Sequence, residues 1–302
     1  MSGEPLIQKG IFGCSLDGYI VFFTDKNSSE ESPTYEVKII DLSSNKQTVI
    51  AQDLPFAHCE KLSCYEFAYT NGTEIFCYNT HNKKIKSIAQ AKNGNKITGF
   101  KGSSSNDSLS IFQVDYKTNK VFVNIISTKT NKVFFEKSIS LNQNETENVF
   151  STCYWVEDAF VFSLQDKLYS IIFKNHPEFF EICNRLDGFA IDNLNVVFYQ
   201  FITDEKTEAR FFNLKTCEIS TKIDQSLDQK IYDCSASNII TAVHNGKYTP
   251  YYVICNIPYL FIEKQWKKVT ELILFEDNQL KINYAEKNGL IDETNFIYTK
   301  KE

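Results

Sequence analysis

The chain has 302 residues, of which 42% are hydrophobic and 14% aromatic, a composition too rich in apolar side chains for a disordered protein. Its formal net charge is only −6, and just two of its 32 basic residues are arginine, so the composition argues against a protein that reads nucleic acid. Phe, Tyr, Ile, Val and Thr dominate the apolar and β-branched positions, which predicts an all-β protein.

The sequence also bears on the compartment. No basic and apolar leader opens the chain, and the longest nearly apolar run, residues 251–262, is far shorter than the roughly 20 residues that cross a bilayer as a helix. We therefore expect no transmembrane segment. Nine cysteines in such a chain fit reduced thiols, so we expect a cytoplasmic protein, with the nucleus as the alternative.

Residues 10–50 read as four short antiparallel strands joined by turns. A tight turn is expected at Leu16-Asp17-Gly18, because glycine tolerates a positive φ. A polar loop, 25–34, separates the second and third strands, and a second turn follows at 43–46. Four strands in about forty residues is the size of one propeller blade. The expected strands are 11–15, 19–24, 35–42 and 47–50.

The rest of the chain repeats this plan. Asn71-Gly72 between two apolar runs is a strong hairpin signal, and the tetrapeptide KTNK, at 117–120 and again at 129–132, marks two successive turns. Four cysteines are expected to be small buried residues at the ends of first strands: Cys14, Cys64, Cys153 and Cys234. The further units are expected to start near residue 62 and to cover 96–141, 149–183, 187–224 and 230–264, with three more strands in 269–300.

These units predict a single domain, residues 1–302, built as a seven-bladed β-propeller with blades of four antiparallel strands. Six blades are the alternative. An unclosed propeller would expose a sheet edge between its first and last blades. We therefore expect residues 5–8 to supply an outer strand that closes the ring with the last blade, 269–300.

One segment carries a specific resemblance. FGCSLDGYIVFF followed by EVKIIDLSSNK resembles the pattern of WD-repeat and TolB-like β-propellers, in which Ser-x-Asp-Gly precedes an apolar strand and a later strand ends in aspartate. The resemblance covers residues 10–46, and beyond them only the strand rhythm is shared. It implies a propeller fold and supports a function in protein binding.

Candidate metal ligands gather in one region, but their spacing does not fit a zinc site. Structural zinc sites pair their ligands two to four residues apart. Here Cys59 and Cys64 have four residues between them, while Cys77 and His81 straddle a strand and its turn. With His58, these residues are interpreted as core thiols and loop histidines, so we expect neither a metal nor another cofactor.

We also expect no enzymatic activity. The chain has only four histidines and no G-x-S-x-G motif, so nothing indicates an activated nucleophile. Turn carboxylates leave one alternative open, a hydrolase that collects them in a propeller channel: Asp17, Glu157, Asp158, Asp192 and Asp204. A third hypothesis, a phosphoinositide or membrane-surface binder, would use the lysine runs in 83–86 and 264–268.

The leading hypothesis is a non-catalytic scaffold or complex subunit that binds a protein partner through its loops. Trp266 lies in a predicted connection between blades, flanked by cations, and tryptophan is enriched in binding hot spots. The other candidates lie in the connection around residue 56 and in loops between second and third strands. The predicted protein-binding residues are Phe56, His58, Asp204, Tyr248, Trp266, Lys267 and Lys268.

Overall fold

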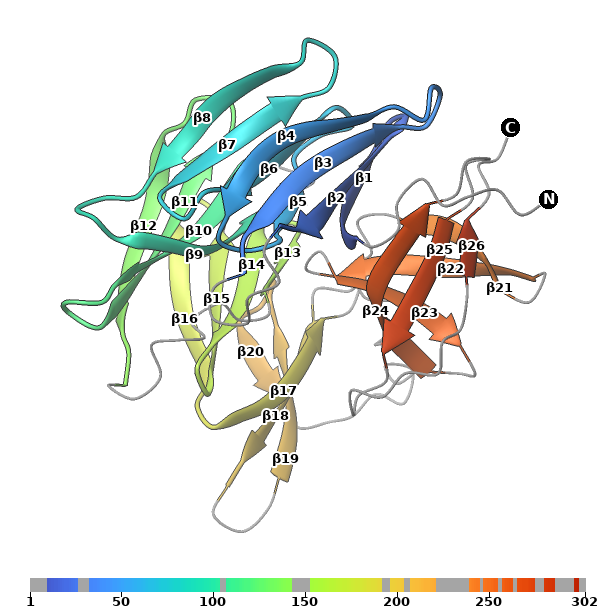
Figure 1. Ribbon diagram of the computed structural model, residues 1–302. Coiled ribbons are helices and arrows are strands. Elements are labelled where there is room, and N and C mark those ends of the chain that lie inside the picture. Colours follow the sequence, from blue (N-terminus) through green and yellow to red (C-terminus); the bar gives the residue numbers. More distant parts are fainter. Residues whose placement is uncertain are drawn as a thin grey trace. The chain divides into compact units, whose positions relative to one another are not determined.

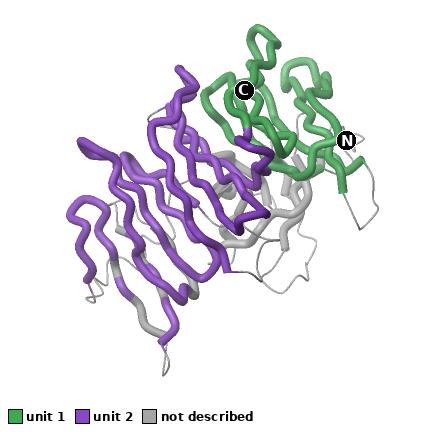
Figure 2. The backbone as a smooth tube through the Cα atoms, turned by 90° about the vertical axis from the view of Figure 1, so that its left-hand side faces the viewer, with its two compact units in different colours: residues 1–90, 236–302 green, residues 91–235 purple. Residues whose placement is uncertain are grey.

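The computed structural model describes residues 10–26, 33–103, 107–142, 153–191, 196–203, 207–220, 239–244, 247–254, 257–262, 265–274, 280–285 and 296–298. The described residues form strands and turns and no helix. The chain divides into two compact units, residues 1–90 with 236–302, and residues 91–235 (Figure 2).

The first unit contains two four-stranded antiparallel sheets, and in each the strands pair in chain order (Figure 1). The Gly18 turn and the Asn71-Gly72 hairpin form as predicted, with φ of 73° at Gly18 and 90° at Gly72. The first sheet holds β1 (Ile11–Leu16), β2 (Tyr19–Asp25), β3 (Tyr35–Asp41) and β4 (Gln47–Leu54). The second holds β5 (Cys59–Lys61), β6 (Glu66–Thr70), β7 (Glu74–Asn79) and β8 (Lys84–Gln90).

The second unit contains three more four-stranded antiparallel sheets, again with strands paired in chain order. The first comprises β9 (Lys96–Gly102), β10 (Ser108–Asp115), β11 (Lys120–Ser127) and β12 (Val133–Ser140). The next comprises β13 (Cys153–Val156), β14 (Ala159–Leu164), β15 (Lys167–Phe173) and β16 (Pro177–Cys183). The last comprises β17 (Leu186–Ile191), β18 (Val196–Ile202), β19 (Thr207–Asn213) and β20 (Glu218–Ser220).

The six C-terminal strands pair differently from the expected sixth and seventh blades. They form one closed antiparallel barrel, in which β21 also pairs with β26. Short strands that follow one another closely favour pairing as successive hairpins, and only two residues separate β23 from β24. The strands are β21 (Ile239–His244), β22 (Lys247–Ile254), β23 (Ile257–Ile262), β24 (Gln265–Leu274), β25 (Leu280–Ala285) and β26 (Phe296–Tyr298).

The described residues therefore contain five four-stranded sheets, and a count of seven stays a prediction. Residues 5–8, predicted to close the ring, and Cys234 lie outside the described residues.

Burial in these sheets depends on strand position. Second strands such as β10 and β14 are largely buried, and third strands such as β11 and β15 are buried along most of their length, whereas the residues of the fourth strands β4, β8, β12 and β16 are mostly exposed or partly exposed. Apolar cores fill the spaces between neighbouring sheets within each unit: between the first two sheets, between β9–β12 and β13–β16, and between β13–β16 and β17–β20. Neighbouring sheets within a unit thus pack face to face, and their fourth strands lie toward solvent.

A recurring hydrogen-bonded turn closes the third strand. The side chain at the strand's end accepts backbone N–H groups two and three residues later, as Asn79 Oδ1 does from His81 (3.0 Å) and Asn82 (3.2 Å). Asp41 and Asn213 repeat this arrangement. The residue four positions on has a positive φ, 57° at Lys83. Because the donors are backbone N–H groups, these bonds do not depend on which side chains the donating residues carry.

The two predicted KTNK turns also form, and both asparagines adopt a positive φ, 50° at Asn119 and 56° at Asn131. Asparagine tolerates this conformation better than most residues. The repeat in the sequence therefore reflects a repeat in the backbone.

The predicted start of the second sheet was wrong. Its first strand, β5, begins at Cys59 and not near residue 62, so Cys59 is the buried thiol at this position while Cys64 is exposed in the following turn. Cys14 and Cys153 are buried as predicted. The strand was missed because its three residues, Cys-Glu-Lys, carry almost no apolar signal.

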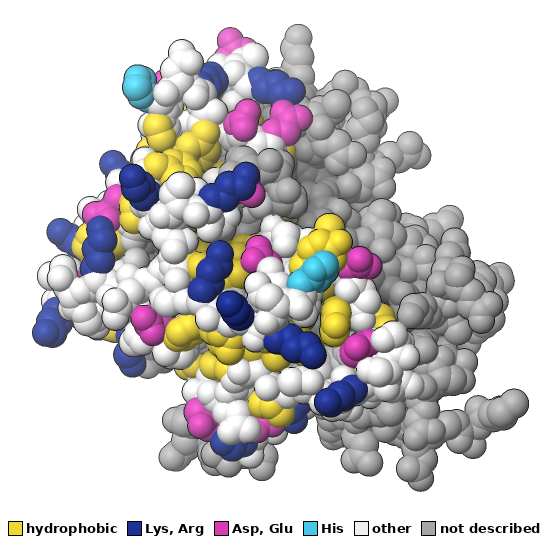
Figure 3. All heavy atoms as spheres, turned by 90° about the horizontal axis from the view of Figure 1, so that it is seen from above, with side chains coloured by type: hydrophobic (Ala, Val, Ile, Leu, Met, Phe, Trp, Pro, Cys, Tyr) yellow, Lys and Arg dark blue, Asp and Glu magenta, His cyan; other side chains and the backbone are white. Residues whose placement is uncertain are grey.

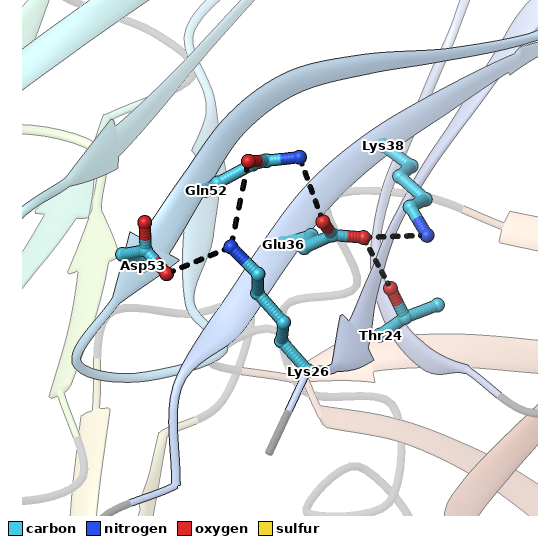
Figure 4. A network of polar contacts seen from close by, with 6 residues as sticks. All are labelled: Thr24, Lys26, Glu36, Lys38, Gln52 and Asp53. Atoms are coloured by element: carbon cyan, nitrogen blue, oxygen red, sulfur yellow. Dashed lines mark hydrogen bonds and ion pairs between the residues drawn. The ribbon is translucent and has the colours of Figure 1, made fainter.

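A polar network ties together three strands of the first sheet (Figure 4). Glu36 and Lys38, two apart on β3, share one face of the strand and form an ion pair of 2.8 Å. Gln52 Nε2 donates to the other oxygen of Glu36 at 2.8 Å, and Lys26 reaches Asp53 at 3.0 Å. The Lys38 ammonium holds the pKa of Glu36 below its usual value.

Candidate binding cleft

The second unit has a cleft of about 360 Å³ where the sheets β13–β16 and β17–β20 meet. This volume lies within the usual range for ligand pockets. The cleft is lined by residues from both sheets: Val156, Glu157, Asp158, Ala159, Ile172, Phe173, Lys174, Leu214 and Lys215.

Three turns supply the charged residues of this lining. Glu157 and Asp158 form the turn between β13 and β14, Lys174 follows β15, and Lys215 lies between β19 and β20. In an antiparallel meander, the turns after the first and third strands lie at the same end of the sheet. The order of the strands therefore brings together residues that are far apart in the sequence.

The floor of the cleft is apolar and firmly packed. Ala159, Ile172 and Leu214 are almost completely buried and belong to the core between the two sheets, against which Val156 also packs. Groups in such a core are close-packed and move little. The cleft therefore opens over a rigid apolar surface.

The rim is charged, and two contacts cross it from one sheet to the other. Lys215 Nζ lies 3.5 Å from Glu157 Oε2, and Lys174 Nζ donates to the Cys217 thiol at 3.7 Å. Glu157 and Cys217 both have a positive φ, 46° and 62°, which few residues other than glycine adopt. The Asp158 carboxylate is exposed at the same rim and forms no hydrogen bond or ion pair with any residue in the described part of the chain.

An aromatic group, which we call the aromatic rim, lies where β12 contacts this end of the sheet β13–β16. It consists of Phe134 and Phe135 from β12, Trp155 from β13 and Phe173 from β15. The Phe173 ring stacks on Trp155, with centroids 5.6 Å apart, and meets Phe134 edge to face at 5.7 Å. Trp155 Nε1 donates to the Lys101 carbonyl at 3.1 Å, which fixes the indole.

A β-bulge explains why Phe134 is exposed. The pairing of β11 with β12 shifts between Ile125 and Ile126, so that Phe134 and Phe135 together oppose Ile125. Both rings then contact Phe173, although successive residues of a regular strand point to opposite faces. The side chain of Phe134 remains 45% exposed.

The sequence-predicted binding residues lie elsewhere. Phe56 and His58 are half-buried in the connection between β4 and β5, where the His58 N–H donates to the Phe56 carbonyl at 3.1 Å. His58 Nε2 lies 3.6 Å from the buried Glu60 carboxylate. Asp204 is outside the described residues. Whether these residues bind a protein stays a prediction.

The predicted location of the other candidates was wrong. Trp266, Lys267 and Lys268 belong to β24 and not to a connection between blades, and Trp266 pairs with Phe261 across a hairpin. Tyr248 is the second residue of β22 and pairs with Val243. The Gln-Trp-Lys-Lys segment looked like a polar connection because its lysines interrupt the apolar pattern.

The candidate metal ligands occupy different environments. Burial raises the pKa of the Cys77 thiol to about 12, and the His81 ring packs against Tyr65 at a centroid distance of 3.9 Å. Across the residues that the structure describes, no three His, Cys, Asp or Glu side chains are grouped closely enough to hold a metal ion.

The first lysine run lies on an exposed outer strand. Lys84 and Lys86 lie on β8, where solvent reaches both side chains, and Lys83 forms the preceding turn. Within the described ranges, no helix has the length and apolar character needed to cross a membrane.

Comparisons with known proteins give information on the fold alone. No protein-family model matches the chain, and no curated protein matches it. Among solved structures, the β-propeller domain of the Trilobed protease from Pyrococcus furiosus is 12% identical, with a TM-score of 0.51 over 97% of this chain and 94% of that one. Acylaminoacyl peptidase from Pyrococcus horikoshii is 12% identical with a TM-score of 0.48, and TolB from Acinetobacter baumannii is 11% identical with a TM-score of 0.45.

The matched shares of these chains differ. The chain is covered to 94% and 95% by the acylaminoacyl peptidase and TolB matches, but it spans only 50% and 68% of those proteins. The likeness to the Trilobed protease domain, together with the four-stranded antiparallel sheets, confirms the predicted β-propeller fold. Membership of the WD-repeat group stays a prediction.

Sequence reasoning identified only part of the cleft. Glu157 and Asp158 were predicted to be turn carboxylates. The aromatic rim was missed, although the sequence holds a signal for it. Two consecutive phenylalanines, 134 and 135, follow the second KTNK turn and break the alternation of the strand, as a bulge does.

Proposed function

We propose that this propeller is a non-catalytic scaffold that binds a protein partner, and that the cleft and the aromatic rim form its contact surface. The observation that carries the proposal is an apolar cleft floor, flanked by exposed charged turns and by a partly exposed aromatic group, at one end of a sheet. Protein interfaces combine aromatic and apolar centres with polar rims in this way.

Rigidity supports this proposal. The Lys215 N–H donates to Asn213 Oδ1 at 2.8 Å, which fixes the turn on one side of the cleft. The Phe173 N–H donates to the Asp158 carbonyl at 2.7 Å, which fixes the other side. A surface that is already ordered loses less conformational entropy when a partner binds.

A hydrolase remains the alternative from the sequence, and the cleft does contain two carboxylates. Catalytic carboxylates depend on burial or strong neighbouring charges to tune their pKa. Glu157 and its partner Lys215 are both more than 60% exposed. This environment favours recognition of a partner over proton transfer, so we include the absence of catalysis in the proposal.

The test is quantitative affinity purification with two double variants. Phe134→Ser with Glu157→Lys changes the aromatic rim and the cleft, and both side chains are exposed enough for the fold to tolerate the changes. Val49→Ser with Asp53→Lys is the control: it likewise replaces an exposed apolar side chain and an exposed, lysine-paired carboxylate, in the first sheet.

We expect the first double variant to lose partners that both the wild type and the second variant retain, as measured by label-based mass spectrometry. Equal partner recovery by all three proteins would refute a contact surface at the cleft. The sequence-predicted candidates have their own variant, Trp266→Ala, in the same measurement.

A further inference from the structure

Figure 3 shows that, on one face of the molecule, hydrophobic side chains lie between lysines and acidic residues. The cleft has the same mixture, but its charges are not equivalent. Lys215 is engaged by Glu157, and Lys174 lies against the Cys217 thiol. The Asp158 carboxylate also lines the cleft, and it forms no hydrogen bond or ion pair with another described residue.

We propose that the cleft receives a lysine or arginine side chain of the partner protein, an inference that rests on the proposed function. The cationic head would meet the Asp158 carboxylate, with Glu157 next to it on the same turn. An ion pair with a carboxylate that is already exposed requires little additional desolvation of that carboxylate.

The apolar floor suits the rest of such a side chain. Lysine and arginine carry three or four methylene groups that pack on apolar surfaces while the charged head stays near water. Val156, Ala159, Ile172 and Leu214 provide that surface directly below the charged rim. A small anion would use the lysines of the rim but not this floor.

Charge complementarity points the same way. The chain has a formal net charge of −6, so its long-range field attracts a basic segment. Among the charged groups of the rim, both lysines already have a contact with another described residue, whereas the Asp158 carboxylate has none. An incoming cation therefore gains a contact without breaking one.

The test uses side-chain analogues and the full chain. Protein labelled at isoleucine and leucine methyl groups is titrated with n-butylammonium, n-propylguanidinium, n-pentanol and pentanoate, and the methyl NMR signals of Ile172 and Leu214 are followed. We expect the two cations to shift these signals with dissociation constants in the millimolar range and to bind more tightly than the alcohol or the carboxylate.

Two variants at matched positions sharpen the result. Asp158→Asn is expected to weaken cation binding three- to fivefold, as an exposed ion pair allows. Asp166→Asn, at an exposed turn between β14 and β15, is expected to leave it unchanged. Asp158→Lys is expected to abolish cation binding and to let pentanoate shift the same signals.

Equal binding of n-pentanol and n-butylammonium, or tighter binding of pentanoate by the wild type, would overturn the proposal. If the cations do not bind but Phe134→Ser with Glu157→Lys still loses a partner, the cation proposal fails while the proposed function stands. If the cations do not bind and the partner is also retained, both fail.

Discussion

Gly13 on β1 lies beside Cys59 on β5, where the first two sheets pack together, and replacing it tests this packing. The pairing of β1 with β2 shifts between Phe12 and Cys14, so Gly13 is the extra residue of a bulge. A Cβ atom at Gly13 would lie 2.7 Å from Cys59 Sγ and 3.0 Å from the Val21 carbonyl oxygen. Gly13→Ala therefore forces atoms of a buried region apart.

The size of the effect follows from these distances. Non-bonded heavy atoms are comfortable at about 3.5–4.0 Å, so the thiol must move by about 1 Å. Overpacking of this kind costs about 1–3 kcal/mol. Alanine restricts the unfolded chain more than glycine does, which returns about 0.4–1 kcal/mol. We expect Gly13→Ala to lower the free energy of unfolding by about 1–2 kcal/mol.

A double-mutant cycle with Cys59→Ala isolates the steric cause. Removing the Sγ atom eliminates the closest contact, and the contacts with Val21 and Phe23 remain. Gly13→Ala should then cost about 1 kcal/mol less in the Cys59→Ala background, within the range usual for residues in contact. Urea unfolding of the four proteins, followed by tryptophan fluorescence, measures this coupling free energy.

Gly94→Ala is the control for a backbone effect. Gly94 has a φ of 76°, and a Cβ atom there meets nothing within 4 Å. Its replacement should lower the free energy of unfolding by about 1–2 kcal/mol through the left-handed conformation alone. The decrease should be the same with or without Cys59. Additive effects of Gly13→Ala and Cys59→Ala, within about 0.3 kcal/mol, would refute the steric argument.

Three further changes test other parts of the fold, each by urea unfolding. Glu36→Gln should cost about 0.5–1 kcal/mol at pH 7. Because Lys38 holds the pKa of Glu36 below 4.5, this contribution is complete above pH 4.5 and is lost as the pH falls through the folded-state pKa. A difference in unfolding free energy between wild type and variant that is as large at pH 3 as at pH 7 would contradict this reasoning. Gly72→Ala should cost about 1–2 kcal/mol because φ is 90° there, and a neutral result would exclude that strain. Trp155→Phe should cost about 0.5–1.5 kcal/mol, because the Lys101 carbonyl loses its indole donor and keeps the Ser110 hydroxyl, and an unchanged midpoint would mean that the indole bond contributes nothing.

The parts of the fold that the sequence predicted well have strong local signals. Gly18 and Asn71-Gly72 mark turns because few residues tolerate a positive φ. The two KTNK segments mark turns for the same reason. Apolar second strands such as β10 and β14 are buried on both faces, so their composition alone identifies them.

The errors occur where local signals are weak or ambiguous. β5 has three residues and no apolar run, so its start was placed too late. Trp266 to Lys268 form part of a ten-residue strand whose lysines resembled a connection. The closed barrel of β21 to β26 depends on the pairing of β21 with β26, a contact between residues more than fifty positions apart. Periodicity carries no information about such a contact.

The cleft was beyond sequence reasoning for a related reason. Glu157 and Lys215 are separated by more than fifty residues, and only the order of strands in two neighbouring sheets brings them to 3.5 Å. The bulge at Phe134 is likewise a property of the pairing of β11 with β12. A sequence reading can find the turn residues one by one, but their grouping depends on which sheets are neighbours.

The recurring turn explains how different side chains can occupy this end of a sheet while the backbone keeps the same conformation. Asn79 and Asn213 hold their turns through backbone N–H groups of the residues that follow. The side chain two positions on therefore takes no part in the bond, and it is His81 in one sheet and Lys215 in another. The backbone of these turns is fixed by one asparagine, while the neighbouring side chain is free to vary. Lys215 can thus form its ion pair with Glu157 across the cleft while the sheet keeps its geometry.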